Sequence, residues 1–164
     1  MSRSRRPPPR PTPPRGRPHA NGRSEPAPRA RLLVVDDHAD TRELLYTILK
    51  TEGYDVAVAE DGDVALQCYR ERPADVVLMD LFMPRKDGVT AIRELFAEFP
   101  SVTIVAMSGD TGGGGAGWHD ALAEARTAGA QLTLRKPLEP WVLLRALEGL
   151  FAARKSLNGL HRSA

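Results

Sequence analysis

Polar side chains that can do chemistry stand at the ends of four short apolar runs in this 164-residue chain. Asp36 and Asp37 follow RLLVV, and Asp80 closes VVLMD. Ser108 follows IVAM, and Lys136 follows QLTLR. If these runs are parallel strands of one sheet, the side chains meet at one edge, because sites form beyond the carboxyl ends of such strands.

The chemistry of this set points to a metal ion and a phosphoryl group. Three carboxylates held close together repel and raise each other's pKa unless a cation lies among them. Mg²⁺ suits such oxygen ligands and often shares them with a phosphate. Lys136 can pair with a phosphoryl oxygen, and Ser108 can donate a hydrogen bond to another. A phosphoryl group carried on a carboxylate would use all of these groups.

Short apolar runs alternate with helical periodicity from residue 31 onward. The run at 75–80 is continuous, as in a central strand that is covered on both faces, whereas 55–61 alternates and predicts a strand with one less buried face. Five such alternations predict an α/β fold with a parallel sheet and right-handed crossovers. The expected strands are 31–37, 55–61, 75–80, 102–110 and 130–137.

Helix signals separate these strands. Asp40 and Glu43 have the spacing of a capping box at the start of the first helix, and Gly53 is placed to end it. The fourth helix is expected over 118–128 and the fifth, which is strongly apolar, over 141–151.

Composition divides the chain into an arm and a body. Residues 1–30 hold nine of the fourteen prolines and eight arginines against one acid, a net charge of +7. The remainder has 15 basic and 20 acidic residues, a net charge of −5, so the arm accounts for the overall +2. The arm lacks large apolar residues to bury, so we expect it to be disordered. We expect a folded domain over 31–154 and a short tail over 155–164.

The sequence indicates a cytoplasmic protein. It has no apolar segment typical of a secretory signal and no run long enough to span a membrane. The single cysteine, Cys68, excludes an internal disulfide and is expected to be a half-buried helix residue. The histidines His19, His119 and His161 have no clustered partners, and no zinc site is predicted from them.

Five motifs in order resemble the receiver domain of response regulators in two-component phosphorelay signalling. The resemblance covers about residues 31–153, the whole predicted body. Each motif alone is weak, but their order at the ends of alternating strands is specific. They are Asp36-Asp37, VVLMD with Asp80, FMPRKDG, Ser108 after IVAM, and GAQLTLRKP.

The resemblance implies a flavodoxin-like (βα)5 three-layer sandwich with strand order 2-1-3-4-5. It implies that Asp80 takes a phosphoryl group from a histidine kinase or a histidine phosphotransfer protein. Asp37, Asp80 and the backbone carbonyl of Phe82 would bind Mg²⁺ directly, and Asp36 would act through a water molecule. Lys136 would pair with the phosphoryl group, and the peptide bond before Pro137 would be cis. The chain would not be an enzyme beyond its own phosphorylation and dephosphorylation.

Two features depart from this family. Thr133 stands where receivers usually carry an aromatic residue that changes rotamer on phosphorylation. We therefore expect the output to use another face, or phosphate relay without a large conformational change. The segment from Ser108 to Lys136 is also longer than usual, and the glycine-rich stretch 111–115 accounts for the excess.

Several residues have plainer structural interpretations. Asp36 and Asp37 could cap the first helix, Ser108 could be a turn residue, and Lys136 could be a solvated strand end. His38 is interpreted as a helix-entry residue, since imidazole is a poor Mg²⁺ ligand. Asp87-Gly88 is interpreted as a turn and helix start.

The sequence also bears on two other classes of function. A phosphatase of the haloacid dehalogenase type would need a second acid two residues after Asp80, where Phe82 stands. Nucleic acid is expected as no more than a weak partner of residues 1–30, since no helix-turn-helix follows residue 154. A pseudo-receiver that only docks remains the alternative to a stand-alone receiver that signals by contact with an unknown downstream protein.

Overall fold

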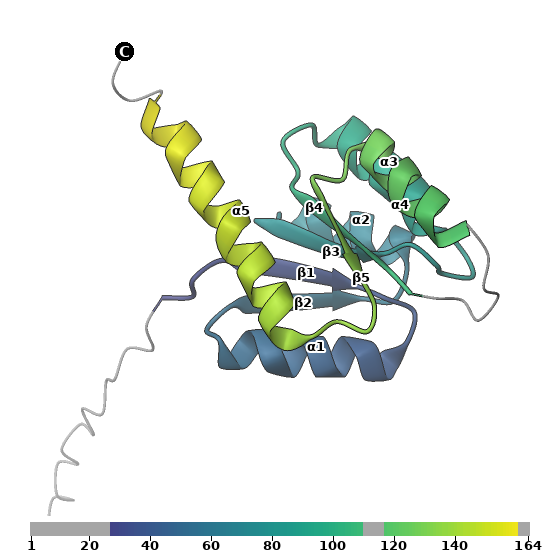
Figure 1. The fold of residues 1–164 in the computed structure, drawn as a ribbon, viewed down its shortest axis with the longest axis horizontal. Coiled ribbons are helices and arrows are strands. Elements are labelled where there is room, and N and C mark those ends of the chain that lie inside the picture. The colour runs from purple at the N-terminus through teal and green to yellow at the C-terminus, as the bar shows by residue number, and fades with distance from the viewer. Residues whose placement is uncertain (1–26, 110–116, 161–164) are drawn as a thin grey trace, which may run out of the picture.

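The computed structural model describes residues 27–109 and 117–160, which form a parallel α/β fold (Figure 1). Within the described residues, five parallel strands make one sheet in the order β2-β1-β3-β4-β5. This is the predicted strand order. The strands are β1 (Arg31–Val35), β2 (Asp55–Ala59), β3 (Val76–Asp80), β4 (Ile104–Ser108) and β5 (Leu132–Arg135).

Helices cover both faces of the sheet, as the three-layer prediction requires. On one face, α1 (Ala39–Thr51) and α5 (Pro140–Leu160) pack through Leu45, Leu49, Leu143 and Leu147. The other face is covered by α2 (Gly62–Glu71), α3 (Gly88–Glu98) and α4 (Gly117–Ala128).

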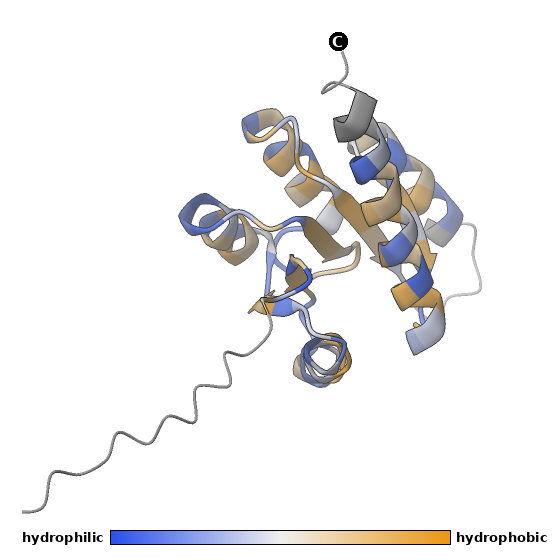
Figure 2. Ribbon diagram, turned by 90° about the vertical axis from the view of Figure 1, so that its left-hand side faces the viewer, coloured by the Kyte–Doolittle hydropathy of each residue, from blue (hydrophilic) through white to orange (hydrophobic). Residues whose placement is uncertain are grey.

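Burial follows the hydropathy of the strands. β3 and β4 are buried along their whole length, and both lie inside the sheet. β2 lies at an edge and buries its residues only in part, as its alternating sequence predicts. Figure 2 shows the central strands as an apolar layer between helices that carry polar outer faces. Each fully buried Leu, Ile or Val contributes about 1.5–3 kcal/mol, so the ends of the central strands are held firmly.

The start of α1 corrects one prediction. The N-cap of this helix is His38, and Asp40 lies in the first turn, so Asp40 and Glu43 do not form the predicted capping box. At this position the Asp40 carboxylate still stabilises the helix, because it lies near the positive end of the helix dipole. The side chains of Asp61 and Asp87 do cap helices, since they accept hydrogen bonds from Val64 N and Thr90 N at the starts of α2 and α3.

The last helix runs further than its apolar pattern indicated. α5 continues past Phe151 to Leu160, and Figure 1 shows its last turns extending beyond the sheet. Ala, Arg and Lys in this part are good helix formers. Arg154 also fixes it to the start of β3, because its guanidinium donates to the Asp75 carbonyl oxygen at 2.7 Å. The domain boundary near residue 154 stays a prediction.

Some sequence predictions fall on residues 1–26, 110–116 and 161–164, outside the described part of the chain. They concern most of the basic arm and the glycine-rich stretch 111–115. Among the described residues, no helix combines the length and apolar character needed to cross a membrane. Cys68 is partly buried in α2 beside the core, as predicted, and burial raises the pKa of its thiol.

Candidate functional site

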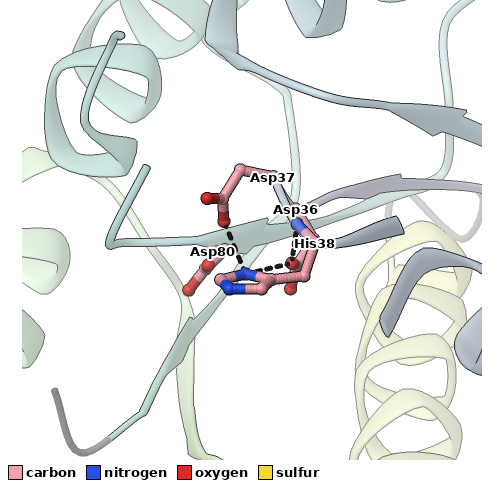
Figure 3. A group of neighbouring side chains, drawn as sticks. All are labelled: Asp36, Asp37, His38 and Asp80. Carbon is pink, nitrogen blue, oxygen red and sulfur yellow. Dashed lines mark hydrogen bonds and ion pairs between the residues drawn. The ribbon is translucent and has the colours of Figure 1, made fainter. Parts of the chain in front are cut away.

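Acidic side chains from β1 and β3 meet at the carboxyl edge of the sheet. Asp36 and Asp37 follow β1 directly, and Asp80 is the last residue of β3. One ligand atom from each of these acids, together with one from His38, lies within 4.8 Å of the others. Figure 3 shows the four side chains gathered in one group. The convergence predicted from strand ends is thus present.

Lys136 places its ammonium group between two of these carboxylates. Its Nζ lies 2.5 Å from Asp36 Oδ2 and 3.1 Å from Asp80 Oδ2. The Lys136 side chain is only 20% exposed, so the interpretation as a solvated strand end is wrong. Its backbone N–H donates to the Ser108 carbonyl oxygen at 2.7 Å, and the following bond to Pro137 is cis, as predicted.

Asp80 is buried at the end of an apolar strand, with 3% of its surface exposed. Burial raises the pKa of this carboxyl above its ordinary value, and Asp36 adds to the effect, while the Lys136 ammonium opposes it. Phe82 N–H donates to Asp80 Oδ1 at 3.5 Å, which makes a weak bond. The carboxylate form of Asp80 therefore depends on added positive charge.

This raised pKa predicts a pH dependence of stability. Asp80 holds its proton more tightly in the folded chain than in the unfolded chain, so the free energy of unfolding falls as pH rises through the raised pKa. We expect Asp80→Asn to be more stable than wild type near neutral pH. The gain should disappear below about pH 3, where the carboxyl is mostly neutral in both states.

Urea unfolding in EDTA across this pH range measures the effect. A variant less stable than wild type at neutral pH would contradict the raised pKa. The matched control is Asp120→Asn, an exposed position on α4, whose stability should track that of wild type.

Gly88 packs closely against the backbone of Asp80 and Leu81. A Cβ built on Gly88 would lie 2.0 Å from the Asp80 carbonyl oxygen and 2.7 Å from Leu81 Cα. No side chain fits there without a shift in the backbone. The Asp87-Gly88 pair does start α3, as predicted, but its contact with Asp80 was not visible in the sequence.

Among the described residues, two buried polar atoms near the ends of β1 and β4 have no hydrogen-bond partner. They are Ser108 Oγ, in a residue with no exposed surface, and Asp37 Oδ1. The Asp37 oxygen lies 2.9 Å from His38 Nδ1, but no hydrogen bond joins the two atoms. Unpaired buried polar atoms are costly and call for an ion, a water molecule or a ligand. The carboxylate donor set fits a hard divalent cation such as Mg²⁺.

The loop after Asp80 carries Phe82 and is anchored by two basic side chains that the sequence analysis did not single out. The Phe82 side chain is exposed, and the predicted role of its carbonyl oxygen stays a prediction. These two anchors are the adjacent basic residues of the RKD motif, and the sequence also shows several acidic residues around the start of α2 with which they could pair. Arg85 pairs with Glu60 and Asp61 at 2.9 and 2.7 Å, and Lys86 pairs with Asp63 and Glu94 at 2.6 and 2.5 Å.

His38 is the helix-entry residue that the sequence predicted, but it also joins the cluster. It occupies the N-cap of α1, and its side chain makes no capping hydrogen bond. The imidazole instead faces Asp37, as Figure 3 shows.

Thr133 lies on β5 beside Ala106 of β4 and is half-buried. Its hydroxyl accepts a hydrogen bond from Arg126 of α4 at 2.9 Å. This position therefore ties β5 to α4 through a polar contact.

The described residues thus form a parallel α/β sheet with an acidic cluster and a lysine at its carboxyl edge, an arrangement suited to binding a cation and a phosphate. Comparison with known proteins agrees. The family model described as the response regulator receiver domain matches residues 32–148. The chain belongs to this family, and it is a phosphoacceptor signalling module of two-component systems.

Individual relatives match over different shares of their length. The chemotaxis protein CheY of Thermotoga maritima is 36% identical over 118 residues, which cover 71% of this chain and 93% of that protein. The DNA-binding response regulator MtrA of Mycobacterium tuberculosis is 43% identical over 83 residues, 51% of this chain and 36% of that protein. Thus the match spans little more than a third of MtrA.

The structures agree as well. A CheX–CheY–BeF3–Mg²⁺ complex from Borrelia burgdorferi superposes with a TM-score of 0.65 at 26% identity. The match covers 74% of this chain and 88% of that chain.

Proposed function

We propose that Asp80 is the residue that accepts the phosphoryl group, in a reaction that depends on Mg²⁺. The observation that carries this is the Lys136 ammonium group between Asp36 and Asp80. Ser108 ends the neighbouring strand β4, and its hydroxyl has no hydrogen-bond partner among the described residues. These groups present one nucleophilic oxygen together with donors for the oxygens of an incoming phosphoryl group.

The donor would be the phosphohistidine of a histidine kinase or a histidine phosphotransfer protein. An Asp80 carboxylate oxygen attacks phosphorus while the phosphorus–nitrogen bond breaks. The electron pair of that bond leaves with the imidazole, which then takes a proton. Lys136 and Ser108 stabilise the charge on the phosphoryl oxygens. Hydrolysis of the resulting acyl phosphate by water would return the free carboxylate.

Asp37, Asp80 and the carbonyl of Phe82 would hold Mg²⁺, with Asp36 acting through water. The bound ion would supply charge neutralisation between the carboxylates and the phosphoryl group. The unpaired Asp37 oxygen supports this assignment, as does the presence of Mg²⁺ in the similar Borrelia burgdorferi complex. We place the protein in the cytoplasm, where two-component kinases present their phosphohistidine.

Labelling with a small phosphodonor tests this proposal. Incubation with acetyl phosphate and Mg²⁺ should add the mass of one phosphoryl group to the intact chain, and EDTA should prevent it. Absence of the adduct at every Mg²⁺ concentration would reduce the protein to a pseudo-receiver that only docks.

We also propose that the phosphorylated state is read without the α4–β5–α5 face undergoing the main change. Thr133 cannot fill space as an aromatic ring does, and it is already bonded to Arg126. In amide hydrogen exchange with and without beryllium trifluoride and Mg²⁺, we expect the larger changes at the start of α1 and in the loop after β3. Large changes confined to α4, β5 and α5 would contradict this.

A further inference from the structure

The metal pocket of the proposed function, formed by Asp36, Asp37 and Asp80, also holds an imidazole nitrogen of His38. His38 Nδ1 lies 2.9 Å from Asp37 Oδ1 and 3.6 Å from Asp36 Oδ1, on the solvent side of the cluster. The His38 side chain is 72% exposed, whereas that of Asp36 is fully buried. The imidazole therefore stands at the solvent-exposed mouth of the pocket.

The backbone fixes His38 at this mouth. Its N–H donates to Asp36 Oδ1 at 2.9 Å, and its carbonyl oxygen accepts from Arg42 N–H at 3.1 Å in the first turn of α1. Because the side chain takes no part in capping the helix, its orientation toward Asp37 involves no loss of a helix contact.

The spacing of these atoms suits a single ion. Metal–nitrogen and metal–oxygen bonds of about 2.0–2.2 Å place two ligands of one ion no more than about 4.4 Å apart. The candidate ligand atoms here lie within 4.8 Å of one another, so a small side-chain movement is enough. Asp37 Oδ1 is buried and has no hydrogen-bond partner within the described part of the chain, so this oxygen is available as a ligand atom.

The chemical type of the ligand atoms determines which metal ion gains affinity from His38. Mg²⁺ prefers oxygen and keeps its water, so an imidazole adds little to its binding. Zn²⁺ and other first-row transition ions accept imidazole readily, together with carboxylates.

We propose that His38 gives this pocket a second metal preference, for a transition ion such as Zn²⁺. His38 Nδ1 and the carboxylates of Asp37 and Asp80 bind that ion, whereas Mg²⁺ is bound by the oxygen ligands without His38. The inference rests on the metal pocket of the proposed function, and it makes Zn²⁺ a competitor for the carboxylates that phosphorylation requires.

Calorimetric titration of the full chain with Zn²⁺ and, separately, with Mg²⁺ tests this proposal. We expect His38→Ala to weaken Zn²⁺ binding at least about tenfold, since even the loss of an outer partner of a ligand costs about 10–100-fold. Mg²⁺ binding should change by less than about twofold, which also shows that the variant is folded. His119→Ala, an imidazole on α4, is the matched control and should leave this Zn²⁺ site intact.

Co²⁺ provides a second readout, because its absorption spectrum responds to a nitrogen ligand. The wild-type spectrum should change in His38→Ala, and Asp37→Asn should abolish both Co²⁺ and Mg²⁺ binding. Equal Zn²⁺ affinity in wild type and His38→Ala, with Mg²⁺ still bound, would overturn the inference and leave the proposed function standing. His38-dependent Zn²⁺ binding that survives in Asp37→Asn would place the zinc elsewhere and also overturn it. A wild-type chain that binds no Mg²⁺ would instead count against the proposed function.

Discussion

Asp80→Asn should lose all labelling by acetyl phosphate, which is the largest effect we expect from any single substitution. The amide has nearly the shape of the carboxylate, so the buried end of β3 keeps its packing. It lacks the nucleophilic oxygen, and no acyl phosphate can form at this position. Intact mass after incubation with the donor and Mg²⁺ measures the loss.

The control for this variant is Asp120→Asn, which removes an exposed carboxylate from α4 and should label as wild type does. Full labelling of Asp80→Asn would show that another carboxylate accepts the phosphoryl group. Because we expect this variant to be more stable than wild type near neutral pH, a loss of labelling would reflect lost chemistry and not a failure to fold.

Lys136→Met should have the second largest effect, on both stability and labelling. It leaves two buried carboxylates, Asp36 and Asp80, without the cation that now contacts both. Removing one partner of a buried ion pair costs about 3–5 kcal/mol, and partial exposure of Lys136 puts the expected loss of unfolding free energy at about 3 kcal/mol. Mg²⁺ should restore part of that loss, because it supplies positive charge to the same carboxylates.

The labelling rate of Lys136→Met should fall by about 10²–10³-fold, as when one stabilising donor is removed from an active site. Urea unfolding with and without Mg²⁺, and a time course of intact mass, measure the two effects. Lys155→Met, an exposed lysine near the end of α5, is the matched control. A Lys136→Met variant as stable as wild type in EDTA would contradict the role given to this ammonium group.

The convergence of Asp36, Asp80 and Lys136 could be predicted because apolar runs and strand ends are local features, whereas the strand order followed from the resemblance to receivers. Parallel topology then brings distant strand ends together without further information. The cis bond before Pro137 followed from the resemblance to receivers. The start of α1 was misplaced because Asp40 and Glu43 fit a capping motif that the chain does not use.

Other features depend on side-chain placement in three dimensions. The close approach of Gly88 to the Asp80 carbonyl depends on how the loop between β3 and α3 folds back, which a linear pattern does not report. The orientation of His38 toward Asp37 is a choice among rotamers. The unpaired state of Ser108 Oγ follows from what surrounds it, and the anchoring of Arg85 to acids before α2 depends on the path of the loop.

The assignment of Asp80 as phosphoacceptor is tested most directly by locating the phosphoryl group. Borohydride reduces an aspartyl phosphate to homoserine. The wild-type chain is therefore treated with acetyl phosphate and Mg²⁺, reduced and digested, and peptide mass spectrometry then locates any homoserine. We predict homoserine at position 80 and nowhere else. Homoserine at position 36 or 37, with residue 80 unmodified, would contradict the assignment.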